Sequence, residues 1–217
     1  MSSPARARNP RGEGGRLRAD IVQAAAGILD ETGDEQAVTL RAVARRVGIA
    51  APSIYTHFPD VEAILLAVVT DEFGELDRRL ALAADTHRTD GDTSTAEARL
   101  RTVCGAYLDY ARERPQRYRL LFGGLWDSAK ALESGAITAA QAEDLGRETL
   151  RLLVAGIEGC VDVGRSTSTD VWADAVALWL GLHGLAHQRT AAPTFRWPPD
   201  IADRVITALA HLTTEPA

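Results

Sequence analysis

Apolar residues recur every three or four positions along most of the chain, which is the spacing that places them on one face of an α-helix. The first such run begins at Arg16 and carries Leu17, Ile21 and Ile28 on one face before Gly33 ends it. No alternation of apolar and polar residues is long enough to predict a β-strand. The pattern therefore predicts an all-α protein.

Three further helices are predicted close behind the first. A short second helix, capped by Thr39, is expected to run through Val47, and Gly48 ends this helix. Another short helix covers residues 52–58. Asp60 then caps a long helix whose apolar stripe continues to Leu80.

The remainder of the chain predicts a larger helical core, which brings the total to about nine helices. Pro115 ends one of these helices, Gly123 ends the next, and Thr138 with Gln141 forms a capping box at the start of a long one. The predicted ranges are 96–114, a short helix ending at 123, a weaker segment at 127–134, 138–163, 170–189 and 199–213.

Composition narrows the class of protein. Hydrophobic residues make up 46% and charged residues 25% of the chain, which is ordinary for a soluble globular protein. The absence of a long apolar run or a leader pattern leads us to expect no membrane contact and a cytoplasmic location. Cys104 and Cys160 lie in apolar helical patterns, so we expect buried thiols rather than a disulfide or a metal site. We expect no cofactor.

Charge is distributed unevenly along the chain. The overall net charge is −6, yet residues 1–58 hold eight arginines against six acidic residues, a net of +2, which leaves −8 for residues 59–217. An acidic surface repels nucleic acid, so any contact with DNA is expected at the N-terminal end. Residues 1–15 have no helical periodicity and predict a flexible basic arm.

The segment 39–58 has the organisation of a helix-turn-helix, the motif that places a small helix in the DNA major groove. It reads TLRAVARRVGIAAPSIYTHF, with Val43, Ala44 and Val47 facing inward and Gly48 in the turn. Ile54 closes the contact between the two helices. The residues that point outward are therefore candidates for contact with DNA.

This segment resembles the tetracycline-repressor (TetR) family over about residues 16–71. The stretches that carry this resemblance are TLRAVARRVGIA and SIYTHF, the second followed by Pro59 and Asp60. The resemblance implies phosphate contacts from Thr39, Tyr55 and His57 and groove contacts from Ala51, Ser53 and Thr56. The full predicted DNA-binding set is Thr39, Arg41, Ala51, Ser53, Tyr55, Thr56 and His57.

Two positions depart from the family's pattern, and two residues keep alternative interpretations. Val61 stands where a phosphate-binding lysine is common, and Ala50 stands where Ser or Thr often begins the recognition helix. Tyr55 also fits a helix-packing aromatic, and His57 also fits a cap for the helix that follows. Weakened binding to DNA is therefore an alternative.

The C-terminal part resembles the domain type named for a Trp-His-Gly motif, here Trp179, His183 and Gly184. The stretches PQRYRLLFGG and ALWLGLHGLAHQR carry this resemblance, which implies an effector pocket and a dimer interface. The predicted pocket residues are Phe73, Tyr107, Tyr110, Tyr118, Phe122, Trp126, Trp179 and His183. The predicted interface residues are Leu178, Leu182, Leu185, Val205, Leu209 and Leu212.

The pocket residues have alternatives as well. Aromatic residues at helical spacing also fit a hydrophobic core, and His183 also fits a buried histidine bonded to a backbone carbonyl or, less readily, a metal ligand. Trp172, Trp179 and His183 are seven and four residues apart and share a helix face. Gly184 inside a helix predicts a close approach of another helix.

Together these features predict a three-part protein: the basic arm at 1–15, a DNA-binding domain at 16–60, and an effector-binding and dimerisation domain at 61–217. No phosphate loop, nucleophile elbow or metal cluster occurs in the sequence, so we expect no enzyme.

The expected function is a homodimer that binds a palindromic double-stranded DNA operator through half-sites about 34–36 Å apart. The family implies a repressor released by a small hydrophobic effector, through movement of the long fourth helix. A transcriptional activator of the same fold, or a ligand-binding or interaction protein with weakened DNA binding, is the alternative.

Overall fold

The structure is a computed structural model of the chain and describes residues 13–86, 93–123, 128–133, 135 and 137–213. Within these ranges it is helical and contains no strand. It has ten α-helices and two short 3₁₀ helices, against the nine helices expected. They are α1 (Glu13–Thr32), η1 (Glu35–Ala37), α2 (Leu40–Val47), η2 (Ala51–Thr56), α3 (Val61–Asp85), α4 (Thr93–Glu113), α5 (Pro115–Phe122), α6 (Ser128–Glu133), α7 (Ala139–Asp144), α8 (Arg147–Asp162), α9 (Val171–Ala191) and α10 (Ile201–Leu209).

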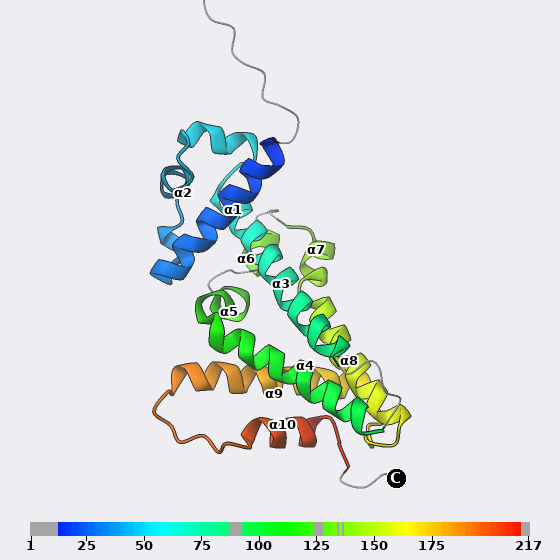
Figure 1. The fold of residues 1–217 in the computed structure, drawn as a ribbon. Coiled ribbons are helices and arrows are strands. Elements are labelled where there is room, and N and C mark those ends of the chain that lie inside the picture. The colour runs from blue at the N-terminus through cyan, green and yellow to red at the C-terminus, as the bar shows by residue number, and fades with distance from the viewer. Residues whose placement is uncertain (1–12, 87–92, 124–127, 134, 136, 214–217) are drawn as a thin grey trace, which may run out of the picture.

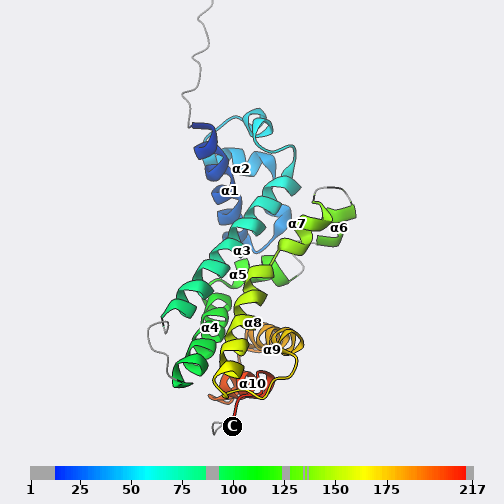
Figure 2. The same cartoon turned by 90° about the vertical axis from the view of Figure 1, so that its right-hand side faces the viewer.

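The molecule is elongated, with a small head at one end and a larger helical body (Figure 1). We call α1, α2, η2 and the first half of α3 the head, and the remaining helices the body. Helices α9 and α10 lie at the end of the body opposite the head, and α9 runs across the long axis, lengthwise in Figure 1 and nearly end-on in Figure 2. No helix within the described ranges combines the length and apolar character needed to cross a bilayer.

Caps predicted from the sequence are present at several helix starts. The Thr39 side chain accepts a hydrogen bond from the backbone N–H of Ala42 (3.1 Å), and Asp60 accepts one from that of Ala63 (2.7 Å). The capping box of Thr138 and Gln141 is complete in both directions. Short-range chemistry therefore fixes these helix boundaries.

Two hydrophobic cores both include residues of α3. The head core buries residues such as Ile21, Val43 and Ile54, and it extends along α3 to Val69. The body core begins on the same helix at Leu76 and continues into α4, α8, α9 and α10. The two cores thus share one continuous helix, whose first half packs in the head core although it follows the boundary expected at residue 60.

The prediction of one helix at 138–163 is wrong, because two non-helical residues, Leu145 and Gly146, interrupt it between α7 and α8. Leu145 is extended (φ −64°, ψ 119°), and Gly146 adopts a left-handed conformation with φ +75°. A Cβ on Gly146 would lie 3.2 Å from the ring of Phe73, so both the backbone angle and the packing favour glycine here. The break turns Leu145 toward the head core.

Candidate DNA interface and ligand cavity

The helix-turn-helix is built as the sequence predicts, with one difference in its second helix. Gly48 takes a left-handed conformation (φ +79°) at the end of α2, and Val43 and Ile54 are fully buried between the elements. The segment expected as an α-helix is the 3₁₀ helix η2. Ala50 provides no side-chain cap and Pro52 has no N–H, so a shorter-range bond from the Ser53 N–H to the Ala50 carbonyl (2.9 Å) forms at its start.

The predicted DNA-contacting residues lie on and beside α2 and η2, in the head, which is at the opposite end of the molecule from α9 and α10 (Figure 1). Tyr55 is 61% exposed, so it is not a helix-packing aromatic in this chain. The Thr56 hydroxyl donates to the Ser53 carbonyl (2.8 Å) and the Thr39 hydroxyl caps α2, so both have intramolecular partners. Thr39, Arg41, Tyr55 and Thr56 are exposed, and Ala51, Ser53 and His57 are half-buried.

Neighbouring residues of the head have structural roles. Asp60 supplies the cap of α3, so His57 is not that cap. Arg46 donates two hydrogen bonds of 2.7 Å to Glu31, which lowers the pKa of this carboxyl and joins α2 to α1. The Arg18 guanidinium lies 4.7 Å from the centre of the Phe58 ring, a cation–π distance. These contacts link α1 to α2 and to the residue that follows η2.

A largely apolar cavity of about 560 Å³ opens between α3, α5, α7, α8 and α9. Three predicted pocket residues line it: Phe73, Phe122 and Trp179. The predicted residue Trp126 lies outside the described residues. The other lining residues are Leu121, Ala142, Glu143, Leu145, Gly146, Arg147, Thr149, Leu150 and Trp172.

The remaining predicted pocket residues do not line the cavity; they are Tyr107, Tyr110, Tyr118 and His183. Tyr107 and Tyr110 are buried in the body core, which raises the pKa of both phenols. The Tyr118 hydroxyl lies 2.7 Å from Nδ1 of His183 and 3.2 Å from the Tyr107 hydroxyl. Burial also raises the pKa of Tyr118 to about 12, which keeps it protonated as a hydrogen-bonding group. His183 is thus bonded to a phenol rather than to a backbone carbonyl.

The sequence carried only partial signals for the cavity's other walls. Trp172 shares the helix face of Trp179, and the structure brings both to the cavity. Leu145, Gly146 and Arg147 line the cavity because the helix is interrupted between α7 and α8. In the sequence, Gly146 is the residue that marks this interruption, and in the structure it adopts a left-handed conformation.

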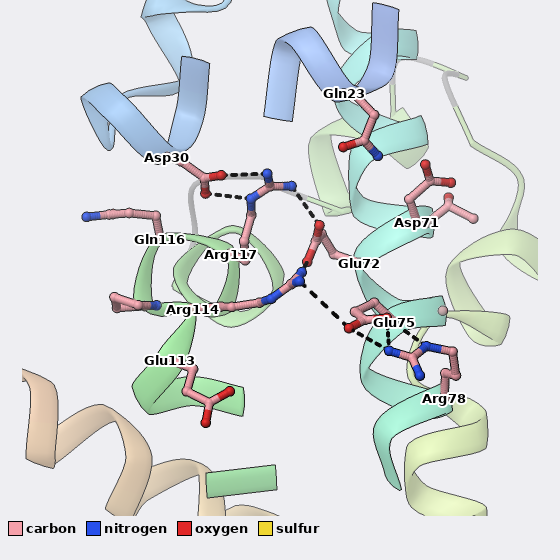
Figure 3. Close-up of a pocket in the computed structure, with 13 residues that line it drawn as sticks. Gln23, Asp30, Asp71, Glu72, Glu75, Arg78, Glu113, Arg114, Gln116 and Arg117 are labelled. Carbon is pink, nitrogen blue, oxygen red and sulfur yellow. Dashed lines mark hydrogen bonds and ion pairs between the residues drawn. The ribbon is translucent and has the colours of Figure 1, made fainter. Parts of the chain in front are cut away.

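A second and larger cleft of about 1020 Å³ lies where the head meets the body (Figure 3). Charged residues dominate its walls, and Arg117 stands between Asp30 of α1 and Glu72 of α3. Arg117 donates two hydrogen bonds of 2.6 Å to Asp30 and one of 2.6 Å to Glu72. Burial alone would lower the pKa of this guanidinium, but the two carboxylates outweigh burial and raise it. Sequence reasoning missed this cluster because its members lie far apart in the chain.

The predicted dimer residues are largely occupied within one chain. Leu178 and Leu182 are fully buried and Leu185 is 6% exposed. A Cβ on Gly181 would lie 2.5 Å from Leu209 and 3.0 Å from Val205, so α10 packs closely against α9 at this glycine. Gly184 is exposed and a Cβ built there would meet no atom within 4 Å, so the close helix approach expected at this residue does not come from the described part of this chain. Leu212 is half-buried against the body core.

Leu180 is 55% exposed on the outer face of α9, which also carries Ala173, Gly184 and His187. The face of α9 that is open to a partner is therefore offset from the predicted one. Periodicity did not distinguish the two faces because α9 is apolar on both.

The cysteines behave as expected. Cys104 and Cys160 are free and buried, and burial raises the pKa of their thiols to about 12 and about 11. No group of three or more metal-ligating side chains occurs in the described part of the chain.

Comparison with known families agrees with this geometry. The family described as bacterial regulatory proteins, tetR family, matches residues 21–68, and that described as tetracyclin repressor-like, C-terminal domain, matches residues 100–212. The first match begins within α1 and ends in the first half of α3, and the second begins within α4 and extends past α10.

Similar solved structures include a protein of unknown function from Rhodococcus sp. RHA1, with 22% identity and a TM-score of 0.69 over 96% of this chain and 95% of that one. A tetR-family regulatory protein from Rhodococcus RHA1 shares 20% identity, with a TM-score of 0.63 over 91% and 97%. The fatty acid degradation regulator FadR from Bacillus halodurans shares 13% identity, with a TM-score of 0.65 over 98% and 100%. These likenesses show a common fold. With both halves matched, the chain belongs to the tetR family of bacterial regulatory proteins and is a non-enzymatic DNA-binding regulator of transcription.

Proposed function

We propose that this protein is a homodimeric, ligand-responsive repressor that leaves its operator when a small hydrophobic effector fills the cavity beside Phe122. The observation that carries the proposal is the position of the 560 Å³ cavity between α3 and α5. Helix α3 continues directly into the head core, so a ligand that displaces α3 also moves the recognition segment. The cytoplasm, where the operator lies, is the proposed location.

The walls of this cavity favour an effector that is largely apolar. The rings of Phe73, Phe122, Trp172 and Trp179 provide flat surfaces for stacking. The hydroxyl of Thr149 donates to Asp77 (2.6 Å) and so has a protein partner already. Charged groups stand mainly at the rim, where Arg147 pairs with Asp144 at 3.1 Å. An aromatic or aliphatic ligand with its polar end at this rim fits these walls.

The outer face of α9 supports the proposed homodimer. Ala173 and His187 lie seven residues on either side of Leu180, so an antiparallel pair of α9 helices centred on Leu180 forms one self-complementary contact. Because α9 crosses the long axis, a two-fold axis along the molecule keeps both heads at the same end (Figures 1 and 2). Two half-sites about 34–36 Å apart require this arrangement.

The proposal is tested with the DNA upstream of the protein's own gene and a panel of aromatic and fatty acyl compounds. The panel is first screened by thermal shift, and fluorescence anisotropy then measures DNA release by each compound that raises Tm. We expect nanomolar to micromolar binding of the fragment and release by at least one stabilising compound. Binding to DNA that no stabilising compound reverses would contradict the ligand-responsive part.

A tryptophan pair locates the effector site. Trp172→Ala removes a cavity wall and is expected to weaken effector binding about tenfold, or about 1.4 kcal/mol, with DNA affinity unchanged. Trp197→Ala is the matched control, because Trp197 packs on Phe195 (ring centroids 4.6 Å apart) and does not line the cavity. Isothermal titration calorimetry measures both variants, and equal losses would place the ligand elsewhere.

A ligand-binding protein with weakened DNA affinity is the second candidate, and two observations favour it. Ala50 gives η2 no side-chain cap, and Val61 has no charge to offer a phosphate. The same anisotropy measurement separates the two candidates, since this one binds the compounds but not the upstream fragment. An activator is distinguished by a reporter whose expression falls, rather than rises, when the gene is deleted.

A further inference from the structure

Helix α5 is seated on the end of α1. Arg117 holds the Asp30 carboxylate through two hydrogen bonds of 2.6 Å, the planar fork geometry that only arginine provides. One residue earlier, the Gln116 side chain lies over Gly33, where a Cβ would stand 3.2 Å from its Oε1. Gly33 follows the last turn of α1 with φ +63°. The first turn of α5 therefore contacts the head directly.

The same guanidinium also binds α3. Its third hydrogen bond goes to Glu72, which is 6% exposed, and the Tyr110 hydroxyl donates to that carboxylate as well (2.9 Å). Arg114 approaches Glu72 at 3.4 Å. Figure 3 shows Arg117 between its two carboxylates. This Asp30–Glu72–Arg117 cluster fixes the relative positions of α1, α3 and α5.

The rest of α5 belongs to the body and to the cavity. Tyr118, next to Arg117, lies within hydrogen-bond distance of His183 on α9. Phe122, in the last turn, lines the cavity and meets the rings of Phe73 (centroids 5.6 Å apart) and Trp179 (6.2 Å). A single helix of eight residues thus touches the head, the proposed dimer helix and the cavity.

We propose that Arg117 is a positioning residue that transmits the state of the cavity to the head through α5 and α1, in parallel with the covalent route through α3. This inference rests on the proposed function. A group that fills the cavity displaces Phe122 and with it α5. Because Arg117 holds Asp30 and Glu72 at once, the displacement changes the position of α1 relative to α3.

The test uses a cavity-filling substitution in place of the unidentified effector. Phe122→Trp adds ring bulk next to the open cavity and is made alone and together with Asp30→Asn in the full-length protein. We expect Phe122→Trp to weaken binding of the upstream DNA fragment about tenfold with Asp30 present, and less than about twofold with Asn at position 30. An equal effect in both backgrounds, including no effect in either, would overturn the inference.

Hydrogen exchange provides a readout that needs no DNA. Phe122→Trp is expected to change amide exchange at the end of α1, around residues 29–33, only where Asp30 is retained. The same change in both backgrounds, or none in either, counts against the role of Arg117. Failure of the wild type to bind the fragment, by contrast, counts against the proposed function and leaves the exchange measurement decisive for Arg117.

The matched control is the adjacent carboxylate. Glu31→Gln makes the same change of charge on α1, but Glu31 pairs with Arg46 inside the head. We expect the Phe122→Trp effect to persist in the Glu31→Gln background and in Asp30→Glu, which retains a carboxylate for Arg117. Loss of the effect in Glu31→Gln would show general damage to the head and overturn the assignment. Circular dichroism and Tm confirm that each variant is folded.

Discussion

His183 is a polar side chain inside an aromatic cluster. Its ring stacks on Trp179 at 5.8 Å and on His187 at 6.4 Å, and its Nδ1 lies 2.7 Å from the Tyr118 hydroxyl. Burial, and then the neighbouring His187, lower the pKa of His183. A neutral imidazole accepts a hydrogen bond from the phenol, whereas a protonated one would place a charge among rings.

This lowered pKa has a consequence for stability. The unfolded chain, with a histidine pKa of about 6.5, binds the proton more readily than the folded chain does. Stability is therefore full above that value and falls as the pH decreases through it toward the lower folded pKa. We expect the free energy of unfolding in urea to decrease from pH 7.5 to pH 5.5 less steeply in His183→Gln than in the wild type. A parallel decrease in both would show that other groups carry the pH dependence.

At the scale of elements, α9 has apolar residues on both of its faces. Leu178 and Leu182 face the body core, whereas Leu180 is 55% exposed. A helix that is apolar all round is ordinarily covered on all sides, which is why a second copy is proposed to cover the outer face. Neutral small residues beside Leu180, such as Ala173 and Gly184, allow close approach of that copy.

The proposed dimer contact predicts a position-dependent effect of one charge. Leu180→Arg places a cation in the middle of the contact and is expected to raise the dimer dissociation constant at least about a hundredfold, as removal of a central contact does. Sedimentation equilibrium measures the dimer dissociation constant. We expect DNA affinity to fall as the dimer dissociates. Leu82→Arg is the matched control, because Leu82 is equally exposed (56%) but lies on α3 and not on the proposed contact helix. A dimer that survives Leu180→Arg unchanged would place the interface elsewhere.

At the scale of the whole molecule, charge is distributed unevenly along the chain. Residues 1–58 carry a net charge of +2 and the remainder of the chain carries −8. An acidic body repels DNA phosphates, so we expect the body to be oriented away from the duplex when the N-terminal end approaches it. Arg6, Arg8 and Arg11, which lie outside the described residues, supply the positive balance of residues 1–58, because residues 13–58 hold five arginines against six acidic residues.

The basic stretch predicts a specific salt dependence. Deletion of residues 1–12 leaves α1 complete, and we expect it to weaken operator binding and to reduce the slope of log K against log salt by roughly 1 to 3. Fluorescence anisotropy between 50 and 300 mM salt measures this slope. A body variant with Arg147, Arg151 and Arg204 changed to Gln removes the same charge from exposed sites and is expected to keep the slope. An unchanged slope in the deletion would exclude phosphate contacts from these arginines.

The sequence by itself determined the local features of this protein. The all-α class, the caps at Thr39 and Asp60, the turn at Gly48 and the family of the head each depend on residues within a few positions of one another. Hydrophobic periodicity and capping act over one or two helical turns, so the sequence displays them directly.

Only the tertiary structure decided which distant residues meet. Arg117 and Asp30 are 87 residues apart, and Tyr118 and His183 are 65 apart, so no local pattern links them. Periodicity also could not say which face of α9 is turned inward, because both faces are apolar. That choice depends on how α9 packs against α4, α8 and α10, and it moved the proposed dimer contact from Leu178 and its neighbours to Leu180. Long-range packing selects among faces that short-range chemistry leaves equivalent.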